Sequence, residues 1–424
     1  MLRFPALLFA AFAAMASVAS GQETGDGWGV DVRGFALGTY AGRTTGRLPS
    51  GSEGRALLLG EERLRLDLTA WTDAVEAEAR VKLDGIHDAV AGDFDPDLRE
   101  AYLDYTAENL DFRLGRQIAT WGVGDLLFIN DVFPKDYVSF FSGRPLEYLK
   151  VGVDGFRARY SSDVLNTEAL IIPRFEPDTL PAPKRFFLYD GYAFVTNRSE
   201  ELPDTTLGNT EIALRFYGNF GGFDLAGYAY RGRWRSPGQR ADDPNNVTRV
   251  TSIYPPLSVY GISAQGQALG GVLSLEGGYY DSRDDRSGDD PAIPNSQARF
   301  LVGYQKQLWR DFTLGAQYYA EILSNFGAYK RSLPAGFARG KKYRDLVTVR
   351  LTQLLAHETW KLSLFAFYGP AENDYLLRPK VTYKVSDHLS AALGANLFGG
   401  EKRTTLFGQF DQDDNAYINL RYDF

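Results

Sequence analysis

The sequence predicts an all-β fold, a closed antiparallel transmembrane β-barrel of about 18 strands. Three observations predict it. Apolar and polar residues alternate in most segments of the chain, short and long connections alternate between those segments, and the last alternating segment ends at the final residue, Phe424. The composition agrees, with 25 Tyr, 28 Phe and 44 Gly beside 2 Met and with no long apolar run after the N-terminus. A wall that faces lipid on one side and water on the other has this composition.

Residues 1–21 are predicted to be a secretory signal peptide. Arg3 precedes an apolar run over residues 4–18, small residues follow at 19–21, and cleavage is expected between Ala19 and Gln22. The run is shorter than the roughly 20 residues that a membrane-spanning helix needs. The chain contains no Cys, which excludes disulfides and thiolate metal sites. Residues 22–424 are therefore expected to form the barrel.

Strict alternation locates the strands. In residues 63–70 every second residue is apolar, and residues 75–85 repeat the pattern with Glu76, Glu78 and Arg80 on the polar face. Most predicted strands have about the 10 residues that a tilted strand needs to cross a bilayer. The predicted strands cover residues 28–41, 56–72, 75–85, 98–107, 109–118, 150–160, 165–172, 207–218, 222–234, 256–267, 271–282, 296–308, 311–323, 343–354, 359–369, 374–385, 388–397 and 415–424.

The connections between these strands are short and long in turn. Bacterial outer-membrane barrels show this asymmetry, with short periplasmic turns, longer outer loops, an even strand number and both termini in the periplasm. Residues 404–410 could form a nineteenth strand, but an odd number would leave the C-terminus outside. Residues 398–414 are therefore predicted to be one outer loop that can hold a short helix at 405–410.

The C-terminal strand indicates the location of the protein. Ile418, Leu420, Tyr422 and Phe424 share one face, and this strand must pair with the first strand to leave no open edge in lipid. It resembles the terminal strand of outer-membrane proteins, which the barrel-assembly machinery recognises. We therefore expect the bacterial outer membrane, with its lipid and lipopolysaccharide as neighbours. The net charge of −8 argues against nucleic acid as a partner, and the sequence leaves an oligomer open.

Charged residues on the inner face are candidates for lining an aqueous pore, because an 18-stranded barrel is wide enough for a channel. Fixed charges in a low-dielectric wall select solutes by sign. Alternatively, neighbouring Arg and Glu residues pair across strands and hold the wall together. Arg378, Lys380 and Lys384 favour selection, because their strand offers only Asp374 as an acidic neighbour. The predicted wall residues are Arg63, Arg65, Glu76, Glu78, Arg80, Arg113, Arg116, Arg378 and Lys380.

The third outer loop, residues 119–149, is unusually apolar for a surface loop. It contains Leu126, Leu127, Phe128, Phe140 and Phe141, which would form a sticky patch in water. We therefore predict that it folds into the lumen as a constriction, and the alternative is a loop that only caps or stiffens the barrel. The residues predicted to face the aqueous constriction are Asp125, Asp131, Lys135, Asp136 and Arg144.

A short motif adds a resemblance to a known family. Residues 113–117, Arg-Leu-Gly-Arg-Gln, followed by Trp121-Gly122, resemble a pattern in proteobacterial porins that are similar to the alginate-export and phosphate-selective families. The resemblance implies an 18-stranded barrel that passes hydrophilic anions through an Arg- and Lys-lined pore. Acidic and basic residues mix on the inner face of this chain, so the residues themselves leave the sign of the solute open.

The sequence thus predicts a porin-like channel for diffusion of small hydrophilic, charged solutes. The alternative is a plugged barrel that acts as a structural or export partner of a periplasmic complex. An enzyme is not expected, because His87 is placed in an outer loop and His357 and His388 at periplasmic turns, too far apart for one site. No metal-ligand spacing or cofactor motif appears, so no cofactor is predicted.

Overall fold

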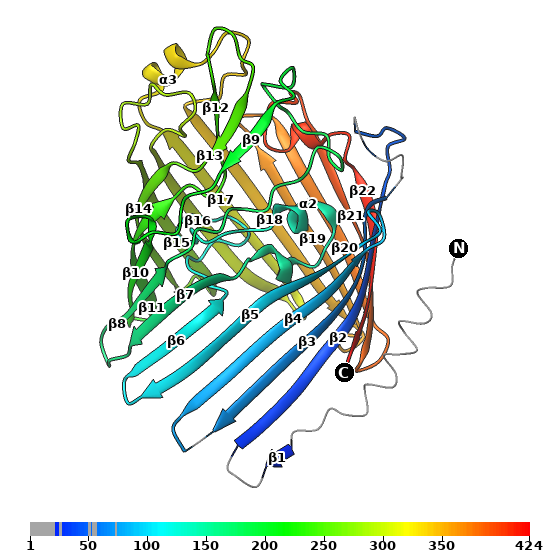
Figure 1. Cartoon of the computed structure of the whole chain (residues 1–424). Helices are drawn as coiled ribbons and strands as arrows, with labels where there is room; N and C mark the ends of the chain where they lie inside the picture. Colours follow the sequence, from blue (N-terminus) through cyan, green and yellow to red (C-terminus); the bar gives the residue numbers. More distant parts are fainter. Residues whose placement is uncertain (1–21, 25–27, 50–51, 53–56, 73) are drawn as a thin grey trace.

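The computed structural model describes residues 22–24, 28–49, 52, 57–72 and 74–424. The predicted signal peptide, residues 1–21, lies outside these described residues. The described chain forms a closed antiparallel barrel of 18 wall strands, which confirms the predicted fold class (Figure 1). Each wall strand pairs with the next wall strand along the chain, and β22 pairs with β2 to close the ring. The wall strands are β2 (Trp28–Arg43), β3 (Leu57–Thr72), β4 (Ala77–Asp88), β5 (Asp93–Ala107), β6 (Leu110–Gln117), β7 (Val153–Tyr160), β8 (Asn166–Ile172), β10 (Glu211–Phe220), β11 (Phe223–Arg233), β14 (Pro256–Ala268), β15 (Gly271–Ser282), β16 (Gln297–Trp309), β17 (Phe312–Leu323), β18 (Tyr343–Leu355), β19 (Trp360–Gly369), β20 (Asp374–Lys384), β21 (Leu389–Gly400) and β22 (Asn415–Asp423).

The two faces of the wall follow the alternation of the sequence. Leu114 on β6, Ile262 on β14 and Leu393 on β21 project outward and are 60%, 69% and 62% exposed. In each strand, the residues that alternate with the outward ones face inward. There, charged side chains such as those of Arg65 and Asp84 pack against one another and are buried. An apolar outer surface around a polar interior is the arrangement that a membrane barrel requires.

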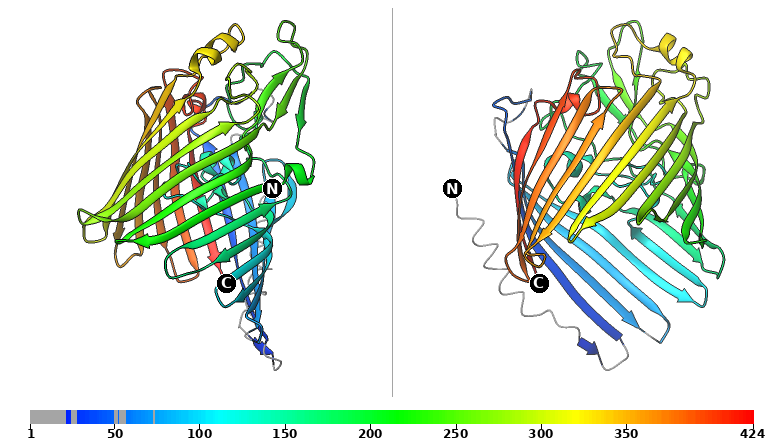
Figure 2. Two further views of the ribbon diagram at one scale, coloured as in Figure 1. Left: turned by 90° about the vertical axis from the view of Figure 1, so that its left-hand side faces the viewer. Right: turned by 180° about the vertical axis from the view of Figure 1, so that it is seen from behind.

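Short turns gather at one end of the barrel, the turn end, and the longer loops at the other, the loop end. The C-terminus lies at the turn end and α3 (Phe326–Ser332) at the loop end (Figure 2). The predicted loop 398–414 begins three residues later than expected, because β21 extends to Gly400, and residues 401–414 contain the short helix η3 (Gly408–Phe410) and no strand. In the described part of the chain, no helix is both long enough and apolar enough to cross a bilayer.

Four short strands were not predicted. β1 (Gln22–Thr24) pairs with β2, while β9 (Arg198–Glu201), β12 (Gly238–Ala241) and β13 (Val250–Ile253) form a small separate sheet at the loop end. Segments of three or four residues are too short to show an alternating pattern, which is why the sequence conceals them.

The largest boundary error concerns the hairpin of β4 and β5. The predicted strand began at residue 98, but β5 begins at Asp93 and pairs as far as Asp88 of β4. Asp and Pro are depleted in strands, so the residues Asp93 to Asp97, with Pro96 among them, look like a loop. As a consequence His87 lies in β4, and its predicted position in an outer loop is wrong.

The predicted inward position of Glu76 is also wrong. β4 begins at Ala77, one residue later, and Glu76 lies in the preceding turn with φ of 46°. A tight turn between antiparallel strands often needs a residue in this left-handed conformation, and that requirement takes Glu76 out of the alternating strand.

Candidate functional site

Residues 119–149, which we call the inner segment, connect β6 to β7 and contain α2 (Tyr137–Ser142) and η1 (Leu146–Leu149). The Asp136 carboxylate caps α2 by accepting hydrogen bonds from the backbone N–H groups of Val138 at 2.9 Å and Ser139 at 3.2 Å. Gly143 ends the helix with φ of 84°, a conformation that favours glycine. A side chain at this position would collide with the ring of Tyr417 on β22. The helix is therefore held at both ends and packed tightly against the wall.

The apolar residues of the inner segment contact wall strands on several sides of the barrel. Phe140 packs against Phe367 of β19 with ring centroids 5.6 Å apart, and Phe141 packs against Phe398 of β21 at 5.9 Å. Further along the wall, Trp121 contacts Tyr228 of β11 at 5.7 Å. All of these residues belong to one buried cluster. The aromatic run that would have been sticky in water is thus buried against the wall strands.

Polar wall residues bind the backbone of the inner segment. The Glu276 carboxylate on β15 accepts hydrogen bonds from the N–H groups of Val123 at 2.9 Å, Gly124 at 3.0 Å and Asn130 at 2.8 Å. On β17, the Gln317 amide accepts from the N–H of Asp125 at 2.7 Å and donates to its carbonyl at 2.9 Å. These wall contacts were not predicted, because alternation shows only that a polar residue faces inward and not which backbone group it meets.

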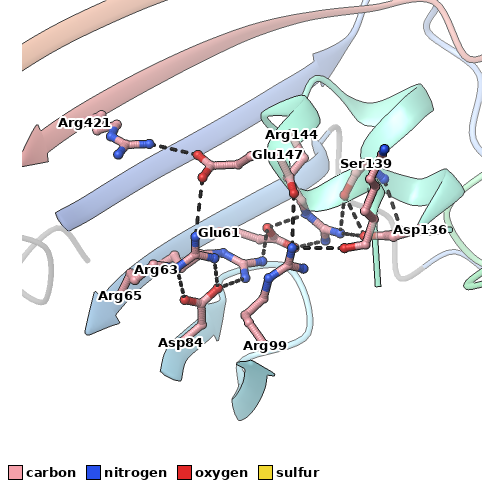
Figure 3. A network of polar contacts seen from close by, with 11 residues as sticks. Glu61, Arg63, Arg65, Asp84, Arg99, Asp136, Ser139, Arg144, Glu147 and Arg421 are labelled. Atoms are coloured by element: carbon pink, nitrogen blue, oxygen red, sulfur yellow. Dashed lines mark hydrogen bonds and ion pairs between the residues drawn. The ribbon is translucent and has the colours of Figure 1, made fainter. Parts of the chain in front are cut away.

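A network of charges joins β3 and β4 to the inner segment (Figure 3). Asp84 on β4 accepts from Arg63 at 2.6 Å and from Arg65 at 2.6 and 2.8 Å. Arg144 of the inner segment donates to Glu61 on β3, at 2.9 Å from its Nε, and also contacts Asp136. Arg63, Arg65, Arg144 and Asp136 were all predicted site residues, and the structure brings them together as a bracing network.

Most other cations of this wall region also have acidic partners, while Arg99 on β5 donates instead to the backbone carbonyls of Glu147 and Lys150 at 3.1 and 3.0 Å. Arg80 on β4 contacts Asp67 on β3 at 2.8 Å, and Lys82 contacts Glu100 on β5 at 2.5 Å. Arg113 on β6 donates to Asp104 on β5 at 2.6 Å and lies over the ring of Tyr102. Glu78 shares the inner face with Arg80. The region β3 to β6 therefore corresponds to the alternative in which charges brace the wall.

Four predicted pore residues do not face an open passage. Arg116 lies on the same side of β6 as the exposed Leu114, so it projects outward, where it contacts Asp154 of β7 at 3.3 Å. Alternation along β6 places Asp111, Arg113, Gly115 and Gln117 on the inner face, and Arg116 on the outer one. Asp131, Lys135 and Asp136 are 6%, 3% and 8% exposed, because the inner segment folds back on itself and encloses them.

A different arrangement occurs on β18 to β20. Arg378 on β20 is 7% exposed, its Nε donates to Asn396 at 3.1 Å, its Nη1 has no hydrogen-bond partner, and it lies over the ring of Phe140. Among the described residues, Lys361 on β19 and Lys380 on β20 make no ion pair, whereas Lys384 contacts Asp387 at 3.0 Å. Lys361, Arg378 and Lys380, together with Arg350 on β18, border a cavity of about 180 Å³, which we call the basic cavity. Its lining also includes Thr352, Ser363, Thr382 and residues 143–146 of the inner segment.

One acidic residue of the inner segment pairs with a cation that borders the basic cavity. Asp125 contacts Arg350 at 2.7 Å. Burial raises the pKa of Asp125, while the positive charge of Arg350 opposes this shift. The compensation of Arg350 thus depends on the protonation of a loop carboxyl.

The described residues contain no cluster of His, Cys, Asp and Glu that could hold a metal ion. His357 and His388 lie in turns at the turn end, as predicted, and His87 contacts Glu62 on β3 at 2.8 Å.

Comparisons with known proteins reveal similarity in fold only. No family model matches the sequence, and no curated protein matches it. Among solved structures, OccD3 (OpdP) of Pseudomonas aeruginosa is 10% identical with a TM-score of 0.56, covering 96% of this chain and 93% of that chain. OccK5 (OpdH) of the same organism is 10% identical with a TM-score of 0.55, covering 93% and 97%. The outer-membrane protein OccAB3 of Acinetobacter baumannii is 9% identical with a TM-score of 0.54, covering 93% and 99%. The chain therefore shares its porin-type barrel with these proteins, and the resemblance to alginate-export and phosphate-selective porins stays a prediction.

Proposed function

We propose that the protein is a channel of the bacterial outer membrane that passes small hydrophilic anions by diffusion. In this proposal the barrel crosses the membrane with its loop end outside and its turn end in the periplasm. The inner segment folds into the lumen and narrows it. The predicted partners, which are lipopolysaccharide and the barrel-assembly machinery acting on the C-terminal strand, remain predictions.

The observation that carries the anion preference is the lack of acidic partners for Lys361, Arg378 and Lys380. A cation that only braces a wall is stabilised by a neighbouring carboxylate, as Arg65 is by Asp84. Arg378 is buried and loses hydration with little in return, whereas Lys380 is partly buried and Lys361 is exposed. All three leave a positive potential in the space beside them. An anion that enters the basic cavity would supply the missing charge. The hydroxyl groups of Thr352, Ser363 and Thr382 offer further hydrogen bonds there.

The contacts of the inner segment support its role as the constriction. It reaches β3 through Arg144, β15 through Asn130 and β19 through Phe140, and these strands lie in different parts of the ring. A segment with contacts in all three directions has to cross the interior. Residues 143–146 of this segment border the basic cavity, so the proposed constriction lies beside the cations of β18 to β20.

One observation favours the plugged barrel as a second candidate. Phe140 of the inner segment packs against Phe367, and Phe365 packs against Phe367 at 4.4 Å, so that an apolar layer covers the loop side of the basic cavity. Apolar constrictions can close a channel by excluding water. Conductance separates the two candidates directly.

The test is the current of the purified protein in a planar lipid bilayer. We expect stepwise conductance in potassium chloride, and in a salt gradient we expect a reversal potential displaced toward that of chloride. Absence of current at every voltage would favour the plugged barrel. Current with a reversal potential displaced toward that of potassium would retain the channel and overturn the anion preference.

A further inference from the structure

A second cavity lies on the loop side of the inner segment and is mainly apolar. It has a volume of about 590 Å³, and we call it the outer cavity. Its lining includes Phe140 and Phe367, and Phe367 packs against Phe365, which borders the basic cavity. The apolar residues that border it include Leu126, Phe128, Leu188, Leu346 and Leu406. A channel for purely hydrophilic solutes gains nothing from such a surface, because apolar walls offer no hydrogen bonds to a hydrated solute.

Leu126 is held in the outer cavity at a cost in backbone conformation. Its φ is 58°, in the left-handed region that bulky residues rarely adopt. Asn or Gly would fit this backbone with less strain. A leucine kept here against its conformational preference points to a use for its side chain, since strained residues gather at functional sites.

The charges beside the outer cavity are distributed unevenly. Arg299 and Arg344 stand at its border with an adjoining cavity of about 470 Å³, and both contact Glu321. The remaining acidic side chains of the outer cavity are Asp345, Glu372 and Asp374. The adjoining cavity is bordered by six basic residues and two acidic ones, which are Lys135, Arg233, Arg235, Arg299, Lys341, Arg344, Asp131 and Asp178. An apolar space therefore opens beside a basic one.

From this juxtaposition we propose that the outer cavity binds the apolar body of an amphiphilic anion while the anionic group faces Lys341, which makes no ion pair among the described residues, beside Arg299 and Arg344, which share Glu321. This inference deepens the proposed function and rests on it. The solutes that the channel takes up best are then anions with an aliphatic or aromatic body, and compact anions gain nothing from the outer cavity. Leu126, Leu188 and Leu406 determine this specificity by contact with the apolar body.

The test compares two sulfonates that differ only in their apolar body, hexanesulfonate and methanesulfonate. Each is titrated into one side of a planar bilayer that holds single channels in potassium chloride, and the interruptions of the chloride current give an apparent affinity. We expect hexanesulfonate to interrupt the current at a concentration at least about tenfold lower than methanesulfonate, as burial of several methylene groups predicts. We expect the effect to be stronger when it is added on the loop side.

Leu126→Asn is the informative variant. Asn has the branched shape of Leu, although it is smaller, and it tolerates the left-handed conformation, so the variant is expected to fold. We expect it to weaken the hexanesulfonate block about fivefold and to leave the methanesulfonate response unchanged. The matched control is Leu207→Asn, a leucine that is 95% exposed at the loop end and borders neither cavity.

The outcomes separate the two proposals. Equal block by the two sulfonates, or equal effects of Leu126→Asn and Leu207→Asn, would overturn the outer-cavity inference while the chloride current still supports the channel. Absence of any current would overturn the channel and with it the inference. If Leu126→Asn failed to insert into the bilayer, Leu406→Asn would replace it, since Leu406 is 45% exposed and lies in a loop.

Discussion

Two regions of the inner wall both carry cations, but the cations of one region have acidic partners and those of the other, among the described residues, do not. On β3 to β6, Arg63, Arg65, Arg80, Lys82 and Arg113 each contact a carboxylate on the same strand or a neighbouring one. On β19 and β20, Lys361, Arg378 and Lys380 contact no carboxylate in the described part of the chain, and they border a cavity. The difference shows that a charged residue on the inner face of a barrel is not by itself a selectivity residue. Its partners decide whether it braces the wall or acts on a solute.

The largest effect is expected when the pairing of the first region is broken. Asp84→Asn leaves the buried Arg63 and Arg65 without their shared carboxylate, so the free energy of unfolding should fall by about 3–5 kcal/mol. Urea unfolding of the refolded barrel in detergent measures this loss. Lys380→Gln serves as the comparison and should change stability by less than about 1 kcal/mol, since it breaks no ion pair. Equal losses would show that the two regions do not differ.

Removal of an unpaired cation should change selectivity more than stability. Lys380→Gln lowers the positive potential in the basic cavity, and we expect the ratio of chloride to potassium permeability to fall about threefold. The control is the double variant Lys82→Gln with Glu100→Gln, which removes a cation together with its partner and keeps the local charge constant. Reversal potentials in a salt gradient measure both. A shift in the double variant as large as that in Lys380→Gln would contradict the comparison.

Acid should turn a paired cation into an unpaired one. Burial raises the pKa of Asp125, so this carboxyl becomes neutral above the pH of about 4 at which an ordinary Asp does, and Arg350 then loses its partner. As the pH falls, the anion preference should rise, by about twofold. Asp125→Asn should show the higher preference already at neutral pH and a smaller further rise in acid. A pH response identical to that of the unmodified protein would assign the titration to another group.

The smallest effect is expected from a loose pair. Arg159 on β7 lies 4.0 Å from Asp111 and 3.8 Å from Glu168, and its side chain is one-third exposed. Arg159→Gln should change the free energy of unfolding by less than about 1 kcal/mol, because exposed pairs contribute little. The urea titration used for Asp84→Asn measures this change. A loss comparable to that of Asp84→Asn would mean that distance and exposure do not determine how much an ion pair contributes to the free energy of unfolding.

Many residues of the candidate site could be identified from the sequence, but which of them contact one another could not. Alternation placed Arg63, Arg65, Arg80 and Arg113 on the inner face, and the apolar run identified the inner segment. The predicted pore-facing position of Arg116 was wrong because it rested on a motif match and not on alternation. The burial of Lys135 with Asp131 was hidden, since a pair four residues apart looks the same in sequence whether it faces water or protein.

The sequence by itself determined the barrel. Side chains in a strand alternate with a period of two, so the order of apolar and polar residues specifies which face meets lipid and where each wall strand lies, without reference to any distant residue. Only the tertiary structure decided which inner residues meet. Closure of the ring sets Glu61 beside Arg144 and Glu276 beside Asn130, and it leaves Arg378 beside Phe140 with no carboxylate. Such contacts join residues far apart in the chain, and their geometry depends on the stagger of the whole barrel, which no local pattern records.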